Sequence, residues 1–383
     1  MNILYIPRWY PNKFDPQLGV FTLKHAKAAS AYFTIAVIYP CADKSMQTNY
    51  NLEVTEEDTL ITIVAYYHQS NRICNTFRYF RAFTLALNLL TKRFWKPDLI
   101  HAHVLLRTFL IAWLLSWFWK IPYIITEHWT GYVYGAFEKK TMVYKSLCRF
   151  FVKQAKALTV VSEGLLNGMS KQKITNNNTR IISNVVDIPE IKNDIERQIG
   201  PIRMLTVADL VDKNKNISSI INSLNDLQLQ LPDFEYHIIG GGKDGELLIS
   251  LAKEKKMFNK SVFFHGRQSN DYVLNFIQSI DFLIVNSNVE TFSVVTAEAI
   301  ACGKPVIATR SGGPEYFVTK KNGILIEKQD NDGLKQAILK MIPAYRNFDS
   351  FEMRDEMKEK FCADAIGKQL SGLYNQIVQL NGK

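Results

Sequence analysis

Two carboxylates in the second half of the chain, Glu290 and Glu298, stand eight positions apart in a setting that favours sugar chemistry. Glu290 follows the apolar run 282–285, and Glu298 lies in a segment whose pattern predicts a short helix ending at Gly303. A helix that starts behind a strand directs free backbone N–H groups and a positive dipole end at one point, which suits a phosphate. Carboxylates repel a phosphate, but they accept hydrogen bonds from sugar and ribose hydroxyls. The pattern therefore favours a site for a sugar nucleotide.

The chain around this segment alternates short apolar runs with helical patterns, which is typical of parallel sheets covered by helices. We expect an α/β fold of two Rossmann-like, doubly wound parallel-sheet domains, 1–186 and 187–365, joined by a linker at 188–200. The two domains would face a cleft, because ligands of such sheets bind at the carboxyl ends of the strands. Strands are expected at 3–6, 33–38, 60–66, 99–101, 123–126, 158–161, 180–183, 204–207, 236–239, 262–265, 282–285, 306–309 and 323–326. Helices are expected at 21–29, 78–90, 109–119, 140–155, 217–227, 245–256, 271–278, 294–302 and 333–341.

The composition is that of an ordinary globular protein: 383 residues, 47% hydrophobic and 21% charged, enough for two cores. Its five cysteines form no Cys-x-x-Cys pair, which argues against a disulfide framework and for a reducing compartment. The first residues enter a strand-like run without a charged leader, so we expect a cytoplasmic protein. The most apolar stretch, 109–119, is shorter than the ~20 residues that a bilayer requires, and we expect a buried helix there with one aromatic-rich face.

The net charge of +10 is concentrated in the first half of the chain. Residues 1–186 hold 22 Lys and Arg against 10 Asp and Glu, a balance of +12, whereas residues 187–383 hold 24 against 26, a balance of −2. Within 137–156, basic residues are interleaved with aromatic and aliphatic ones, which suits the surface of an anionic membrane. A solvated helix face is the alternative. Nucleic acid is disfavoured as a partner because no binding motif accompanies the charge.

Further short segments occur along the chain in a distinctive order, at 6–11, 19–25, 97–103, 126–131, 161–163, 183–187, 207–210, 215–216, 238–242, 264–266 and 311–315. Together with the Glu290–Glu298 segment, they resemble the family-four (group 1) glycosyltransferases of GT-B architecture, particularly bacterial members acting in surface-polysaccharide assembly. Any one segment alone would be a weak signal. The resemblance covers nearly the whole chain, and it implies that a final helix, about 366–383, packs back on the first domain.

The resemblance implies a division of roles around the acidic pair. Glu298 would hold the ribose hydroxyls of the nucleotide, and Glu290 the hydroxyls of the donor sugar. Thr291, Phe292 and Ser293 would offer backbone N–H groups to the diphosphate at the helix start. Ser293 would also be the N-cap, a compatible role. Outside this framework, such a pair is usually a loop residue and a solvated helix position.

The resemblance also implies that Lys215 stands beside the leaving diphosphate, where a fixed cation lowers the barrier to departure. Lys213 is the neighbouring alternative. The family has an Arg where this chain has Asp209 in the donor site, so a second cation is missing there. Arg267 or Arg8 is the candidate substitute.

His128 follows the strand expected at 123–126, and the resemblance implies that it approaches the donor sugar near the reacting carbon. A lone His at a strand end is otherwise more often structural. His101 and His103 are expected to shape the floor of the cleft. A zinc site made of these three histidines is not expected, because no acidic or thiol ligand accompanies them at a suitable spacing.

Glycines are expected where backbone must approach the donor closely. The turn at 240–242 is by itself a weak dinucleotide signal, because no suitably placed acidic residue completes one. The loop at 330–332, the only Asp-x-Asp in the second half, is expected to cap a helix rather than to bind a metal. The resemblance implies that Gly240, Gly241 and Gly266 line the donor side, and Gly19 would let the backbone approach the phosphates closely.

We therefore expect a hexosyltransferase-type glycosyltransferase that moves a sugar from a UDP- or GDP-linked donor to an acceptor hydroxyl. The acceptor would be a glycan or lipid-linked glycan bound by the N-terminal domain at the inner face of the plasma membrane. The reaction would need no metal or other cofactor, and the family implies retention of configuration. Two alternatives stay open: a nucleotide-sugar 2-epimerase of the same architecture, and a catalytically inactive sugar-nucleotide-binding protein, which the departure at Asp209 does not exclude.

Overall fold

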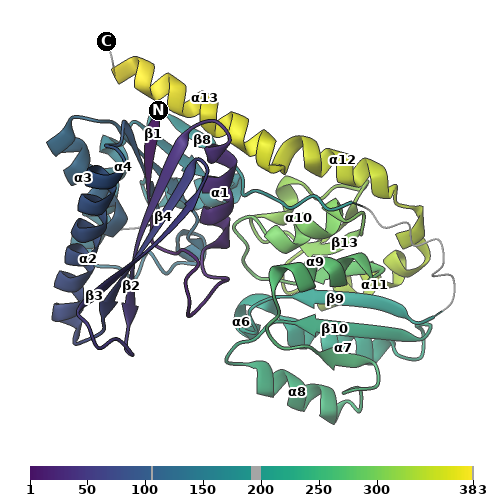
Figure 1. Cartoon of the computed structure of the whole chain (residues 1–383). Coiled ribbons are helices and arrows are strands. Elements are labelled where there is room, and N and C mark those ends of the chain that lie inside the picture. Colours follow the sequence, from purple (N-terminus) through teal and green to yellow (C-terminus); the bar gives the residue numbers. More distant parts are fainter. Residues whose placement is uncertain (105–106, 191–199, 382–383) are drawn as a thin grey trace. The chain divides into compact units, whose positions relative to one another are not determined.

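The computed structural model describes residues 1–104, 107–190 and 200–381, in two compact units (Figure 1). The first unit comprises Met1–Val161, Leu165–Val185 and Ala363–Lys383, and the second comprises Ser162–Gly164 and Val186–Cys362. Residues 191–199 of the expected linker lie outside the described part of the chain.

The first unit is built on an eight-stranded sheet of order β3-β4-β2-β1-β5-β6-β7-β8. All neighbouring pairs are parallel except β3 with β4. Helices α2 and α3 lie on one side of the sheet, and α1 and α13 on the other (Figure 1). The strands are β1 (Asn2–Pro7), β2 (Thr34–Asp43), β3 (Tyr50–Glu57), β4 (Leu60–His68), β5 (Leu99–His103), β6 (Tyr123–Glu127), β7 (Ala157–Val160) and β8 (Thr179–Ile181). The α-helices are α1 (Val20–Ser30), α2 (Arg72–Arg93), α3 (Arg107–Trp119), α4 (Met142–Gln154), α5 (Glu163–Lys171, whose first residues belong to the second unit) and α13 (Ala363–Asn381).

The C-terminal helix α13 is part of the first unit's core. Its apolar side chains Ile366, Leu370 and Leu373 are fully buried with those of β1 and β2. At its centre the hydroxyl of Tyr374 lies 2.5 Å from the hydroxyl of Tyr5 and 2.8 Å from Nδ1 of His101. A polar chain therefore joins the last helix to two central strands of the sheet.

The second unit is built on a six-stranded, fully parallel sheet of order β11-β10-β9-β12-β13-β14. Its strands are rich in Ile, Leu, Val and Phe, as expected for a parallel sheet covered on both faces. The strands are β9 (Ile202–Val207), β10 (Phe234–Ile239), β11 (Val262–Phe264), β12 (Phe282–Val285), β13 (Val306–Thr309) and β14 (Gly323–Ile326). The α-helices are α6 (Asp212–Lys215), α7 (Ile217–Leu227), α8 (Gly245–Glu254), α9 (Asn270–Gln278), α10 (Val294–Ala301), α11 (Asn331–Ala344) and α12 (Ser350–Phe361).

The expected α/β fold of two parallel-sheet units is confirmed, and some local expectations need correction. The antiparallel edge strand β3 and the helices α5, α6 and α12 are absent from the elements expected from the sequence. The helix expected at 109–119 is buried only in its first half, because Trp117 and Phe118 are 74% and 73% exposed. No helix in the described part of the chain is both long and apolar enough to span a membrane.

Candidate active site

Lys215 and Glu290, predicted separately as site residues, form an ion pair at the carboxyl edge of the second sheet. Nζ of Lys215 lies 2.6 Å from Oε1 of Glu290, and the two side chains are only 23% and 13% exposed. Glu290 stands in the loop after β12, and its backbone N–H donates to the carbonyl of Ser311. Because both charges are largely removed from water, their attraction is stronger than that of a surface pair.

The loop that follows β12 also fixes the backbone that carries Lys215. Asn288 donates from its backbone N–H to the carbonyl of Asn214 at 2.7 Å and from its side chain to the carbonyl of Lys213 at 2.8 Å. Asn216, in the left-handed conformation with φ 50°, ends α6 immediately after Lys215. The structure thus brings Lys215 to Glu290, whereas Lys213 is exposed and lies in no ion pair recorded for the described residues.

The start of α10 leaves backbone donors without acceptors. In the described part of the chain, the N–H groups of Thr291, Phe292 and Ser293 donate to no protein acceptor. Ser293 holds the N-cap position, but its φ of 68° is left-handed and its hydroxyl contacts Oγ1 of Thr296 instead of capping the backbone. Ser293 is thus the N-cap residue by position, as predicted, but its side chain caps no backbone N–H, and the helix start remains open to an anion.

Glu298 lies in the middle of α10 and is 4% exposed. Burial raises the pKa of the neighbouring Cys302 thiol to about 12, and the negative charge of Glu298 adds to this increase. Cys302 is therefore an unreactive thiol. Both predicted carboxylates are thus shielded from bulk water, one just before α10 and one within it.

The glycine turn after β10 packs against the loop that carries Asp209. Gly240 has φ 143°, and a Cβ there would lie 1.8 Å from the carbonyl oxygen of Ala208, so only glycine fits. The side chain of Arg267 passes over Gly241, and its Nη2 lies 3.4 Å from Oδ1 of Asp209. Arg267 thereby places a cation beside Asp209, in a mostly exposed pair.

Two other glycines have local explanations. Gly19 is the N-cap of α1 with φ 67°, and a Cβ there would lie 2.2 Å from the carbonyl oxygen of Trp9. Gly19 is therefore required by the chain's own backbone. Gly266 has φ 66°, and no atom lies within 4 Å of a Cβ built there, so its backbone conformation alone calls for glycine.

The loop at 330–332 caps the helix α11, as predicted. The side chain of Asp330 accepts a hydrogen bond from the backbone N–H of Gly333 at 2.8 Å.

His128 lies just beyond β6, in the first unit, and is 6% exposed. The carboxylate of Glu127 accepts from the backbone N–H groups of His128 and Trp129, at 2.8 and 3.0 Å, and fixes the turn after the strand. Nε2 of His128 lies 3.3 Å from Nδ1 of His103. Burial lowers the pKa of both imidazoles well below the usual value, so both are neutral near pH 7.

A third histidine, His25, completes this cluster and was not singled out from the sequence as a site residue. Ligand atoms of His25, His103 and His128 all lie within 4.8 Å of one another. Nε2 of His25 lies 2.9 Å from the carbonyl oxygen of Ser183, and burial lowers its pKa to about 4. The expectation against a zinc site was argued without His25. The sequence did carry a signal for His25, because it ends the segment 19–25, one of the segments that resemble the family.

The sequence of each unit matches a family profile. That of "Glycosyltransferase Family 4" matches residues 25–190, and that of "Glycosyl transferases group 1" matches residues 187–360. The chain belongs to the family-four (group 1) glycosyltransferases. The family identified from motif order is thereby confirmed.

Curated relatives of this glycosyltransferase are distant in sequence. An uncharacterized glycosyltransferase of Methanocaldococcus jannaschii is 28% identical over 246 residues, which cover 64% of this chain and 65% of that protein, just under two thirds of it. The N-acetyl-alpha-D-glucosaminyl L-malate synthase of Bacillus anthracis is 23% identical over 301 residues, which cover 75% of this chain and 77% of that protein.

Two solved structures share the fold over nearly the whole length. Sucrose-phosphate synthase from Thermosynechococcus elongatus has a TM-score of 0.80 at 18% identity, covering 99% of this chain and 100% of that one. HepE from Anabaena, solved in complex with UDP, has a TM-score of 0.73 at 16% identity, covering 98% and 100%. At these identities the likeness shows the fold, which is the GT-B fold expected from the motifs.

Proposed function

We propose that this glycosyltransferase moves a sugar from a UDP- or GDP-linked donor to a hydroxyl of a glycan or lipid-linked glycan, without a metal ion and with retention of configuration. The observation that carries the proposal is the 2.6 Å pair of Lys215 and Glu290 directly before the open N–H groups of residues 291–293. In this proposal the N–H groups and Lys215 bind the diphosphate, Glu290 binds the sugar and Glu298 binds the ribose.

The chemistry of these groups suits departure of a nucleoside diphosphate. Breaking the glycosidic bond builds negative charge on the leaving phosphate, and fixed cations and N–H dipoles stabilise that charge without reorganisation. Glu290 neutralises Lys215 while the donor is absent, and it keeps the ammonium in place until a phosphate arrives. We assign the second cation to Arg267, because its guanidinium already lies beside Asp209.

The comparisons support a nucleotide-sugar donor and say less about the acceptor. HepE is described with UDP bound, and the Bacillus anthracis relative is named for joining a glucosaminyl unit to malate. We propose that the first unit binds the acceptor, and that His128 is the residue of this unit that meets the donor sugar. His128→Ala should then lower turnover more than it changes the affinity for the nucleotide alone.

We further propose that the first unit contacts an anionic membrane through helices α3 and α4. The two helices pack together through Trp113 and Phe150, whose ring centroids lie 5.6 Å apart. Apolar side chains on both helices are at least 40% exposed, and exposed lysines stand beside them, as in surface-bound helices. The apolar residues are Leu114, Trp117, Phe118, Met142, Val143, Leu147 and Phe150, and the exposed lysines include Lys120, Lys139, Lys140 and Lys153.

Vesicle binding tests this surface. The full chain should sediment with vesicles that contain phosphatidylglycerol, less so with phosphatidylcholine alone, and less so at high salt. A double change of Trp117 and Phe118 to Ser should reduce binding, while Leu229→Ser, at a fully exposed leucine of the second unit, should leave it unchanged. Equal binding of the two variants would contradict the proposal.

Product analysis tests the reaction. The chain should be incubated with a panel of UDP- and GDP-sugars, with and without a bacterial glycolipid fraction, and the products separated by mass and by sugar. Transfer to the acceptor supports the proposal, and conversion of donor alone into an isomeric nucleotide sugar would instead identify the epimerase. Lys215→Ala should abolish transfer and Lys213→Ala should preserve it. Absence of any conversion with every donor would favour the inactive binding protein.

A further inference from the structure

Three buried histidines of the first unit, His25, His103 and His128, converge at the carboxyl edge of its sheet and are called the histidine cluster below. His103 is the last residue of β5, and His128 directly follows the neighbouring parallel strand β6. His25 lies on α1, which follows β1, the strand that pairs with β5 on its other side. Ring nitrogens of the three side chains all lie within 4.8 Å of one another. The parallel sheet thus gathers three groups that are far apart in the sequence, all within one unit.

Buried polar atoms are normally hydrogen-bonded, and the histidine cluster departs from that rule. The neighbouring His101 follows it, because both of its ring nitrogens contact side-chain hydroxyls. Nδ1 of His25, by contrast, is buried without a hydrogen-bond partner among the described residues, and so is Nε2 of His103. The other nitrogen of His103, Nδ1, faces Nε2 of His128. The cluster therefore holds ring nitrogens that the surrounding protein leaves available to a further group.

Two of the three rings are held from outside the cluster by adjacent residues of the segment after β8. Nε2 of His25 lies 2.9 Å from the carbonyl oxygen of Ser183, so it carries the proton and leaves the lone pair on Nδ1. The side chain of Asn184 forms a hydrogen bond with His128. Backbone carbonyls orient the histidine ligands of metal ions in the same way as Ser183 orients His25. Burial also lowers the pKa of all three histidines, so they are in the neutral form that binds a metal ion near pH 7.

The spacing of the histidine cluster suits a tetrahedral ion. Zinc lies about 2.0–2.1 Å from each imidazole nitrogen, so two of its ligand atoms are about 3.3 Å apart. Nδ1 of His103 and Nε2 of His128 already lie 3.3 Å apart. The ring of His25 has to come closer by at most about 1.5 Å, which is the difference between that spacing and the 4.8 Å limit of the cluster.

The ligand types favour zinc over the ions of oxygen-rich sites. Imidazole nitrogens suit zinc and similar transition ions, whereas Mg²⁺ and Ca²⁺ prefer oxygen ligands. In the part of the chain that the structure describes, no carboxylate or thiol joins the three rings. The fourth tetrahedral position is therefore left to water or another small ligand.

We propose that His25, His103 and His128 form a binding site for a zinc ion, each through one ring nitrogen. The ion ties α1 to the ends of β5 and β6, and it gives Nδ1 of His25 the partner that this atom lacks. The expectation against zinc considered His101 in place of His25, and His101 is the histidine whose nitrogens are already bonded.

The zinc site is independent of the proposed reaction, which uses no metal ion. One consequence does rest on the proposed function. An ion bound to His128 restrains the residue that we assign to the donor sugar, so zinc should slow transfer.

Zinc titration of the full chain tests the site. The chain is first freed of metal with a chelator, and zinc binding is then measured at neutral pH by competition with a chromophoric indicator. One zinc ion per chain should bind through the cluster, and an excess of Mg²⁺ should not displace it. The melting temperature should rise with the zinc concentration, because a ligand of the native state stabilises that state.

Cobalt is a spectroscopic probe of the same site. It should give the visible d–d bands of a tetrahedral ion without a thiolate charge-transfer band, which separates the histidines from the free cysteines as ligands. A cobalt spectrum with a strong thiolate band would overturn the proposal.

His25→Asn should weaken zinc binding by about 100-fold or more, since residues that only orient a metal ligand already contribute about 10- to 100-fold. His128→Gln changes the least buried of the three positions and should have the same effect. The melting temperature of each variant without metal verifies that it folds. His265→Gln is the matched control, because it breaks the other close histidine pair, His237 and His265, whose ring nitrogens lie 3.0 Å apart in the second unit. It should leave the affinity for zinc unchanged.

The outcomes separate the zinc site from the proposed function. Zinc that does not bind, or that binds both cluster variants as tightly as the wild type, would overturn the site, and so would loss of binding in His265→Gln. Zinc that binds through the cluster without slowing transfer leaves the site standing and removes the assignment of His128 to the donor sugar. If zinc binds through the cluster but no sugar is transferred from any donor, the site stands and the proposed function fails.

Discussion

The hydroxyl of Tyr374 is the polar anchor of the C-terminal helix, and its removal by Tyr374→Phe should destabilise the first unit. That hydroxyl contacts Tyr5 at 2.5 Å and His101 at 2.8 Å, and all three side chains are fully buried. The change to Phe leaves the ring in place, so no large cavity forms. What is lost is the partner of two buried polar atoms.

The magnitude follows from those two atoms. Each buried group left unsatisfied costs about 1–3 kcal/mol, so the variant, which leaves two such groups, should lose roughly 2–6 kcal/mol of unfolding free energy. A unit of about 200 residues loses roughly 2–4 °C of melting temperature per kcal/mol, which gives a fall of about 4–24 °C. Packing of Ile366, Leu370 and Leu373 is untouched, so the helix should remain docked at 25 °C.

Tyr32→Phe provides a matched control, because its hydroxyl also ties to α13, at Asp364, but in an exposed setting at 2.7 Å. It should cost about 0–1 kcal/mol. Differential scanning calorimetry on the full chain, which resolves the two units if they melt apart, measures both variants. A loss for Tyr374→Phe no greater than that for Tyr32→Phe would refute the reasoning.

Two further predictions concern stability. Burial keeps His25 neutral and lowers its pKa to about 4, so the unfolded chain binds a proton at this residue more readily than the folded chain does. The contribution of neutral His25 to the unfolding free energy is therefore present above about pH 6.5 and is lost as the pH falls towards 4. It amounts to about 3 kcal/mol. The pKa values of the neighbouring His103 and His128 are lowered as well, so His25→Asn should reduce the pH dependence of the unfolding free energy without abolishing it. Urea titration between about pH 7 and 4 measures this dependence, and an unchanged slope would contradict the prediction. Gly240→Ala should lower the unfolding free energy by about 2–5 kcal/mol in the same assay, because of the positive φ and the clash with Ala208. Gly372→Ala, in open space on α13, should be neutral or stabilising. Similar effects of the two changes would show that the turn at Gly240 is not strained.

Strands and helices with strong hydrophobic periodicity were predictable from the sequence, and those stabilised by their neighbours were not. In the second unit β12, β13, β14 and α7 have the predicted bounds, because parallel strands and their covering helices are apolar along their length. Strand β3 carries Glu53, Glu56 and Glu57 and has no buried face, so only its pairing with β4 defines it. Helix α12 did carry a signal: Met353, Met357 and Phe361, spaced by four, are its buried side chains.

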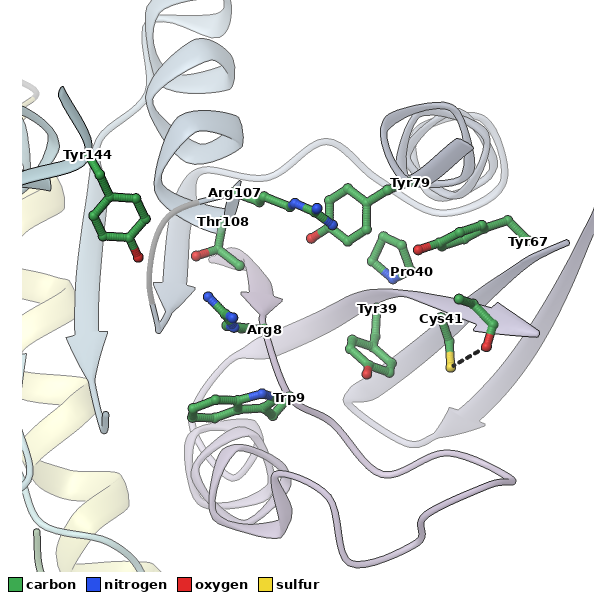
Figure 2. A pocket seen from close by; sticks show the side chains of 11 residues that line it. Arg8, Trp9, Tyr39, Pro40, Cys41, Tyr67, Tyr79, Arg107, Thr108 and Tyr144 are labelled. Atoms are coloured by element: carbon green, nitrogen blue, oxygen red, sulfur yellow. Dashed lines mark hydrogen bonds between the residues drawn. The ribbon is translucent and has the colours of Figure 1, made fainter. Parts of the chain in front are cut away.

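The second unit's predicted site residues lie within one stretch of a motif or at the ends of adjacent strands, and this is why they were accessible to sequence reasoning. The resemblance already favoured Lys215 over Lys213, and the fold supplies the physical reason: the αL residue Asn216 and the loop after β12 decide which lysine faces Glu290. A pocket of about 400 Å³ at the carboxyl edge of the first unit's sheet could be found only from the structure (Figure 2). Its lining residues Arg8, Arg107 and Tyr144 come from distant segments that share no motif, and only the sheet's carboxyl edge brings them together.

Nucleotide binding by Glu298 and Glu290 variants tests the account's central claim most directly. Isothermal titration should show that the wild type binds at least one of UDP and GDP, and that Glu298→Gln binds that nucleotide about 10- to 100-fold more weakly. Glu290→Gln should bind it nearly as well as the wild type does, because the free nucleotide carries no donor sugar for Glu290 to hold. The same Glu290→Gln variant should lose affinity for the intact nucleotide sugar. Failure of both nucleotides to bind, or undiminished binding by Glu298→Gln, would contradict the placement of the donor at the start of α10.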